Sequence, residues 1–117
     1  MEIWVNPACS KCRAATAALD EAGVAYTVRR YLDDPPTREE LAAVVARLGL
    51  EPWDVARTGE PEAAALDDLT RTPADRDRWL DAMAAHPRLI QRPIITADDG
   101  TTVVGRDQAS LDRVLSS

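Results

Sequence analysis

The chain has 117 residues, a length that suits one domain built around one hydrophobic core. Hydrophobic residues make up 45% of it and charged residues 29%, which is typical of a globular protein. The formal net charge of −6 argues against a general nucleic-acid binder, and no apolar run is long enough to cross a membrane. The first residues lack the basic start and the apolar stretch of a secretory signal. We therefore expect a cytoplasmic protein with no nucleic-acid or membrane partner.

The N-terminal part of the chain predicts a strand, a helix and a second strand. Residues 2–5 form a short apolar run, which Asn6-Pro7 interrupts. Residues 13–22 are rich in alanine and leucine, a composition that favours a helix, and Gly23 is a natural stop for it. Residues 25–31 then have the alternation of a strand.

A helical segment follows. Thr37 with Glu40 three residues later is a capping-box pattern, and it opens a helix that runs to Leu48 and ends at Gly49. Three further helical pieces are expected, at residues 52–57, 62–69 and 73–85.

The C-terminal part predicts a β-hairpin and a last helix. The strands are residues 93–97 and 101–104, joined by the turn Asp98-Asp99-Gly100. Asp107 can cap a helix that continues to residue 115.

This order of elements is that of a thioredoxin-like fold. The sequence therefore predicts an α/β protein with a mixed four-stranded sheet, in which the first two strands are parallel and the hairpin is antiparallel. We expect residues 1–117 to form a single thioredoxin-like domain with a helical insertion at about residues 36–86.

The two cysteines, Cys9 and Cys12, lie three residues apart at the start of the first predicted helix. In a cytosolic protein such a pair is more often catalytic or metal-binding than a structural disulfide. Zinc needs about four ligands, and His86 is the only histidine, so we expect no metal. A helix N-terminus lowers a thiol pKa by only about one unit. Nearby cations must lower it further, and Lys11, Arg13 and Arg92 are the candidates.

Two stretches of the chain contain no acidic residue, at 3–19 and 82–97. They hold four cationic residues: Lys11, Arg13, Arg88 and Arg92. Their charge is +4, so the rest of the chain carries −6 − 4 = −10. If the two stretches meet in space, they form a positive pocket that suits a small anion.

Three segments closely resemble the glutaredoxin-coupled arsenate reductase (ArsC) family, which also includes the Spx regulators: Asn6-Pro-Ala-Cys9, Pro35-Pro-Thr-Arg-Glu-Glu-Leu41 and His86-Pro-Arg-Leu-Ile-Gln-Arg-Pro-Ile94. The resemblance implies that the Cys9 thiolate attacks arsenate and that Arg57, Arg92 and Arg106 hold the oxyanion. Glutathione or another small thiol would be the co-substrate, and glutaredoxin or a thioredoxin-type protein the reductant. No bound cofactor is implied. By resemblance we also expect a cis bond before Pro93.

The sequence departs from the reductase pattern at two positions. Val5 stands where the reductases often have a histidine that helps to activate the thiol, and Cys12 is a cysteine that they lack. Cys12 could resolve the adduct on Cys9, form a regulatory disulfide, or have no role. Four residues are expected to support the site: Asn6, Lys11, Arg13 and Pro93.

Two other functions remain open. The first is an Spx-like regulator that binds RNA polymerase and senses oxidation through Cys9 and Cys12. The second is a general thiol–disulfide oxidoreductase. Arg106 favours the reductases, because Spx-type chains usually have an uncharged residue there, and Ser-Lys between the cysteines differs from the usual thioredoxin and glutaredoxin sequences.

Overall fold

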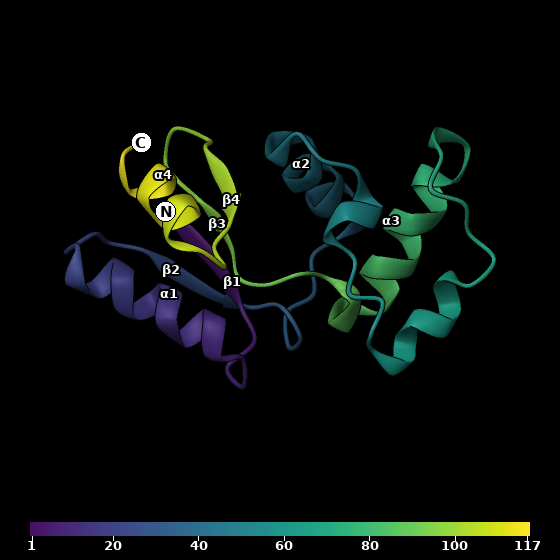
Figure 1. Cartoon of the computed structure of the whole chain (residues 1–117), viewed down its shortest axis with the longest axis horizontal. Helices are drawn as coiled ribbons and strands as arrows, with labels where there is room; N and C mark the ends of the chain where they lie inside the picture. The colour runs from purple at the N-terminus through teal and green to yellow at the C-terminus, as the bar shows by residue number, and fades with distance from the viewer. The chain divides into compact units, whose positions relative to one another are not determined.

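A computed structural model describes residues 1–117, which divide into two compact units (Figure 1). One unit combines residues 1–34 with residues 92–117, and the other is the continuous stretch 35–91. The first unit contains the β-sheet and the second is helical. No helix in the chain has the length and apolar character required to span a lipid bilayer.

The sheet unit contains four strands: β1 (Glu2–Val5), β2 (Thr27–Arg30), β3 (Ile94–Thr96) and β4 (Thr102–Val104). Their order across the sheet is β2-β1-β3-β4. Strand β1 runs parallel to β2 and antiparallel to β3, and β3 pairs antiparallel with β4. The predicted mixed sheet and its strand directions are therefore confirmed.

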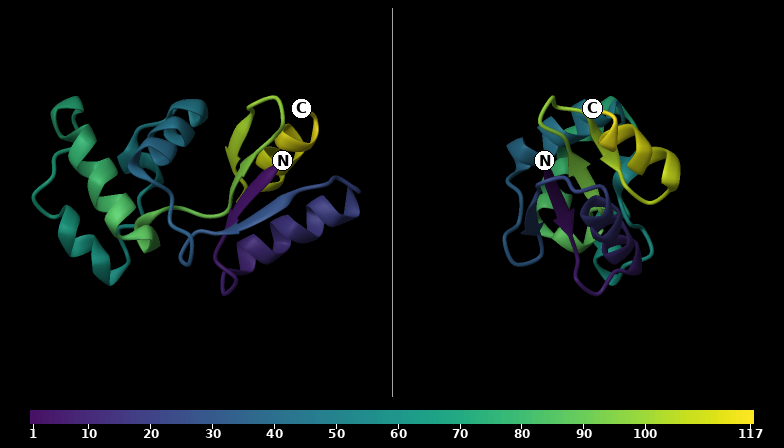
Figure 2. Two further views of the ribbon diagram at one scale, coloured as in Figure 1. Left: turned by 180° about the vertical axis from the view of Figure 1, so that it is seen from behind. Right: turned by 90° about the vertical axis from the view of Figure 1, so that its left-hand side faces the viewer.

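Two helices of the sheet unit, α1 (Ser10–Glu21) and α4 (Gln108–Leu115), pack against the same face of the sheet (Figure 2). Every second residue of a strand points to that face, and these side chains form one apolar cluster with the inward sides of the two helices. The cluster consists of Ile3, Val5, Cys12, Ala15, Leu19, Ile95, Ala97, Val103, Leu111 and Val114. It anchors the beginning of α1, where both cysteines lie.

The helical unit is built on α2 (Arg38–Leu48) and α3 (Arg76–Ala85), which pack together. Arg38 holds them through ion pairs to Asp77 and Asp81, at 2.6 and 2.7 Å. Four short 3₁₀ helices complete the unit: η1 (Pro52–Val55), η2 (Pro61–Leu66), η3 (Pro73–Asp75) and η4 (Pro87–Leu89).

Several predicted boundaries were wrong by a few residues. Helix α1 begins at Ser10 rather than residue 13, because Cys9 takes the N-cap position. Strand β2 is shorter than the predicted 25–31, as expected for an edge strand whose side chains are mostly exposed. The pieces at 52–57 and 62–69 are 3₁₀ helices, each starting at a proline.

Candidate active site

The turn after β1 places Cys9 at the beginning of α1. The amide of Ala8 donates to the Asn6 side-chain oxygen at 3.0 Å, and the amide of Cys9 donates to the Asn6 carbonyl at 2.9 Å. Cys9 is the N-cap residue of α1, with extended backbone angles of −88° and 122°. The sequence-based prediction that Cys9 lies at a helix N-terminus is confirmed, and Asn6 shapes the turn that puts it there.

The site favours the ionised form of Cys9. Partial burial acts to raise the pKa of this thiol, but the backbone N–H of Cys12, the side chains of Arg92 and Cys12, and the backbone N–H of Lys11 outweigh it and lower the pKa to about 7. A thiolate is the nucleophilic form of cysteine.

Arg92 is the cation next to this sulfur. It lies just before β3, and its bond to Pro93 is cis, as predicted. Burial acts to lower the pKa of its guanidinium, but hydrogen bonding and charge interactions with Cys9 and Tyr31 raise it overall. The sheet brings this pair together, because β1 and β3 are hydrogen-bonded neighbours although they come from opposite ends of the chain.

Arg106 is tied to the same segment. Its Nη1 donates to the backbone carbonyl of Arg92 at 2.7 Å. The amide of Gly105 donates to the Pro93 carbonyl at 2.9 Å, which holds the exit of β4 against the entry of β3. Two of the three predicted oxyanion ligands therefore belong to one hydrogen-bonded corner of the sheet unit.

Cys12 is buried in the apolar cluster, with 2% of its surface exposed. Burial raises the pKa of its thiol, and the hydrogen bond to Cys9 and the negative charge of the Cys9 thiolate raise it further, to about 11. On its outer side, Cys12 borders a groove of about 210 Å³ that Val5, Pro7 and Thr16 also line. The two thiols thus differ strongly in acidity although they interact directly.

The side chains of Lys11 and Arg13 point to other partners. Arg13 donates from Nη1 to the Pro7 carbonyl at 3.1 Å, which braces the turn before Cys9. Lys11 is exposed, and its charge acts on Asp107. The pKa of Asp107 is lowered first by the backbone and side chain of Ser110 and then by Lys11. The cation that lowers the pKa of Cys9 is therefore Arg92.

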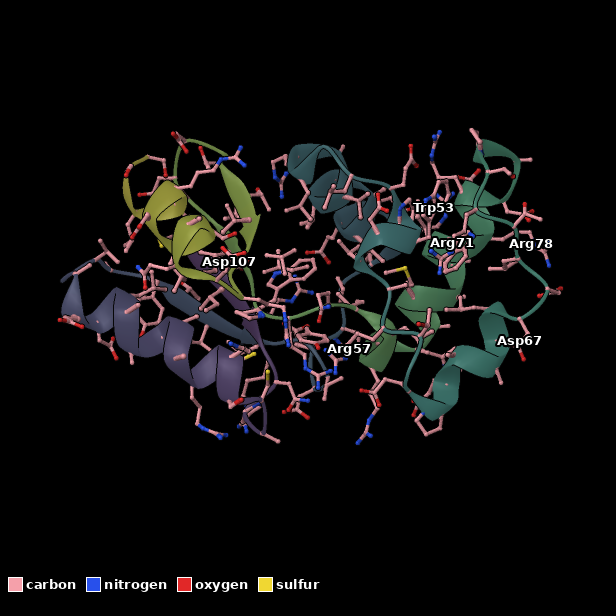
Figure 3. The ribbon with its side chains drawn as sticks, in the orientation of Figure 1. Trp53, Arg57, Asp67, Arg71, Arg78 and Asp107 are labelled. Atoms are coloured by element: carbon pink, nitrogen blue, oxygen red, sulfur yellow. The ribbon has the colours of Figure 1, made fainter.

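Arg57 and Arg88 belong to the helical unit. The Arg57 side chain is labelled in Figure 3. Its guanidinium contacts Glu60 through Nε at 3.3 Å and donates from Nη1 to the Gln91 side-chain oxygen at 2.7 Å. Its backbone amide donates to the Leu89 carbonyl at 2.7 Å. These bonds hold the Arg57 side chain in a defined position within its own unit. Arg88 is exposed.

Sequence reasoning missed Tyr31 as a partner of Arg92. Tyr31 immediately follows β2, and Asn6 immediately follows β1, its parallel neighbour. The carboxyl ends of parallel strands meet at one edge of a sheet, where sites of α/β proteins are commonly built. A tyrosine at that edge was therefore a detectable signal. No three histidine, cysteine or carboxylate side chains gather closely enough to hold a metal ion.

A mixed four-stranded sheet with a cysteine at the N-terminus of its first helix places this chain among the thioredoxin-like proteins. The model of the ArsC family matches residues 4–114. The chain therefore belongs to the ArsC family.

Three similar proteins illustrate this relationship. An uncharacterized protein in the glnII region of Streptomyces viridochromogenes is 58% identical over 118 residues, covering 99% of both chains. An arsenate reductase of Neisseria meningitidis serogroup A is 37% identical over 115 residues, covering 98% of this chain and 97% of its own. The solved structure of an arsenate reductase from Vibrio cholerae superposes with a TM-score of 0.76 at 34% identity, covering 99% of this chain and 97% of that one.

Proposed function

We propose that this protein is an arsenate reductase in which the Cys9 thiolate attacks arsenate held by arginines. Family membership and the names of the relatives support this reaction class. The observation that carries the proposal is the pairing of Cys9 with Arg92 at the N-terminus of α1. It supplies a nucleophile that is about half ionised at neutral pH, together with a fixed positive charge beside it.

The chemistry explains why arginine suits this site. Arsenate near neutral pH is a tetrahedral anion that repels a thiolate. A guanidinium stays charged at any working pH, and its forked donors match pairs of oxygens. In this proposal Arg92 and Arg106 bind arsenate oxygens, and Asn6 and Pro93 shape the segments that carry the nucleophile and these ligands. Arg57 is proposed as a further ligand on the basis of the family resemblance.

A thiol must complete the reaction. Glutathione or another small thiol is the proposed co-substrate, and a glutaredoxin or thioredoxin-type protein the proposed reductant. Such thiols are kept reduced in the cytosol, where we propose that the protein works. We also propose that residues 1–117 act as one ArsC-type domain, with about residues 36–86 as its helical insertion.

The test is an assay of arsenite formation from arsenate with glutathione and glutaredoxin. We expect turnover by the native chain, none by Cys9→Ser, and unchanged turnover by Ser10→Ala, an exposed neighbour in the same helix turn. Full activity of Cys9→Ser would contradict the nucleophile assignment. Absence of arsenite from the native chain with every thiol reductant would contradict the function.

The pair of free cysteines, Cys9 and Cys12, also supports a second candidate function, that of an Spx-like regulator that binds RNA polymerase. We expect a pull-down with purified RNA polymerase to be negative in both the reduced and the oxidised state. A stoichiometric complex would favour the regulator over the enzyme.

A further inference from the structure

We propose that Cys12 is the resolving thiol of this reaction: its sulfur attacks the Cys9 sulfur of the arsenic adduct, releases arsenite and leaves a Cys9–Cys12 disulfide. This inference rests on the proposed arsenate reduction by Cys9. It assigns a chemical role to the one cysteine that the oxyanion chemistry does not use.

The first argument is the position of the two residues on α1. Cys9 is the N-cap and Cys12 is the third helical residue. These are the positions whose side chains face each other in a capping box, because the extended N-cap residue turns its side chain over the first helical turn. The two sulfurs are hydrogen-bonded, and Cys9 packs against the apolar cluster that contains Cys12. The two thiols are therefore neighbours in the first turn of α1.

The second argument is the order in which the two thiols ionise. With its pKa lowered to about 7, Cys9 ionises first. Cys12 keeps its proton, since burial raises its pKa and the Cys9 thiolate raises it further, to about 11. Once the Cys9 sulfur is bonded to arsenic, its negative charge is gone, whereas the charge of Arg92, which lowers the pKa of Cys12, remains. The pKa of the Cys12 thiol therefore falls once the adduct on Cys9 has formed, which is the step at which Cys12 must attack.

The electrons balance within the chain. In the first step a bond forms between the Cys9 thiolate sulfur and the arsenic of dihydrogen arsenate, one arsenic–oxygen bond breaks, and that oxygen leaves as water with both arsenate protons. In the second step the Cys12 sulfur bonds to the Cys9 sulfur, the sulfur–arsenic bond breaks, and its electron pair stays on arsenic. Arsenic is reduced from As(V) to As(III), the two thiols are oxidised to one disulfide, and the Cys12 proton passes to an oxygen of the departing arsenite.

Proximity decides which thiol resolves the adduct. A neighbouring thiol held by the helix acts at an effective concentration far above that of a small thiol in solution, because no translational entropy is lost in bringing it to the adduct. The first release of arsenite therefore does not wait for glutathione. The proposed thiol reductants, glutathione with a glutaredoxin or a thioredoxin-type protein, then supply the two electrons that reopen the Cys9–Cys12 disulfide for the next turnover.

The experiment is a single turnover without added thiol. The reduced, desalted protein is mixed with excess arsenate and quenched in acid. Arsenite is then quantified, free thiols are titrated, and the intact mass is measured. We expect one equivalent of arsenite per chain, loss of both thiols, and a mass lower by two hydrogens. Cys12→Ser and Cys12→Ala are expected to release about a tenth of this arsenite or less.

A parallel assay with glutathione and glutaredoxin separates this inference from the proposed function. We expect both Cys12 variants to turn over there, because an external thiol replaces the missing one, and this activity also shows that they fold. If the native chain makes arsenite with these reductants but none without them, the resolving role of Cys12 is wrong and the reductase function stands. If it makes none under either condition, the proposed function itself fails.

Discussion

The guanidinium of Arg106 donates a hydrogen bond to the backbone carbonyl of Arg92 at 2.7 Å. Arg106 lies two residues after β4 and Arg92 two residues before β3, so the side chain of one proposed arsenate ligand holds the backbone of another. Only one of the two guanidinium nitrogens at its tip is used in this bond, and the other remains available for an oxygen of the substrate.

Arg106→Ala is therefore expected to weaken arsenate binding. Losing a charged ligand that also holds the Arg92 backbone should raise the arsenate KM by roughly tenfold or more. Arg106→Lys should restore little, because an ammonium cannot reproduce the forked geometry of guanidinium. Steady-state kinetics in the glutaredoxin-linked assay measures both variants. The control is Arg113→Ala, which removes an exposed arginine from the last turn of α4. Equal KM values for Arg106→Ala and the control would remove Arg106 from the site.

The pairing of Arg92 with Cys9 predicts a pH dependence. With the pKa of Cys9 lowered to about 7, the rate of alkylation by iodoacetamide should rise with pH and reach half its maximum near pH 7. In Arg92→Ala the hydrogen bond and charge that stabilise the thiolate are lost, so the midpoint should move to higher pH. Alkylation rates are measured in the Cys12→Ser variant, so that Cys9 is the only cysteine that can react. A midpoint that stays near pH 7 without Arg92 would show that the backbone N–H groups alone activate the thiol.

Gly105 is the tightest backbone position at the end of β4. A methyl group there would lie 2.7 Å from Ile95 Cδ1 and 3.4 Å from Leu111 Cδ2, and Ile95 is fully buried. Gly105→Ala should lower the free energy of unfolding by about 1–3 kcal/mol, because the core must shift to admit the added carbon. Gly59→Ala is the matched control, since nothing lies within 4 Å of its added carbon. Chemical denaturation compares the two, and equal stabilities would contradict the overpacking argument.

The capping box of α2 should contribute measurably to stability. The Thr37 hydroxyl accepts from the Glu40 amide at 3.1 Å, and the Glu40 carboxylate accepts from the Thr37 amide at 3.0 Å. Thr37→Ala should cost about 1 kcal/mol of unfolding free energy. Thr58→Ala removes an exposed threonine outside any helix and should cost much less. A thermal melt followed by circular dichroism tests this, and a loss no larger than that of Thr58→Ala would show that α2 is held by packing alone.

Local signals in the sequence were sufficient to predict most of the fold. The Thr37 and Glu40 spacing, Gly49 with its positive φ of 70°, and the Asp107 cap each satisfy a backbone requirement of one helix end, so each predicts a boundary directly. The start of α1 was predicted too late because a cysteine at the N-cap is not among the preferred capping residues. Cys9 makes no side-chain cap hydrogen bond there, so the helix gains no capping bond from this residue.

The candidate site was predictable only in part. Cys9 and Arg92 could be named from motifs, and the structure pairs them. The role of Tyr31 depends on the contact it makes with Arg92, and residues so far apart in the chain are brought together only by tertiary structure. The same holds for Lys11, whose charge acts on Asp107 instead of the nearby cysteine. A sequence identifies a charge, but the partner of that charge is set by packing.

The division of the sheet unit into two chain segments has a consequence for biosynthesis. Central strand β1 is made before the helical stretch 35–91, but its antiparallel neighbour β3 is made only after it. We expect the helical stretch to fold first during translation, since its contacts are local. Strand β1 can pair with β3 only afterwards. Arg92 is made after the helical stretch, so we expect Cys9 to gain its guanidinium neighbour, and with it the full lowering of its thiol pKa, only when β3 pairs with β1.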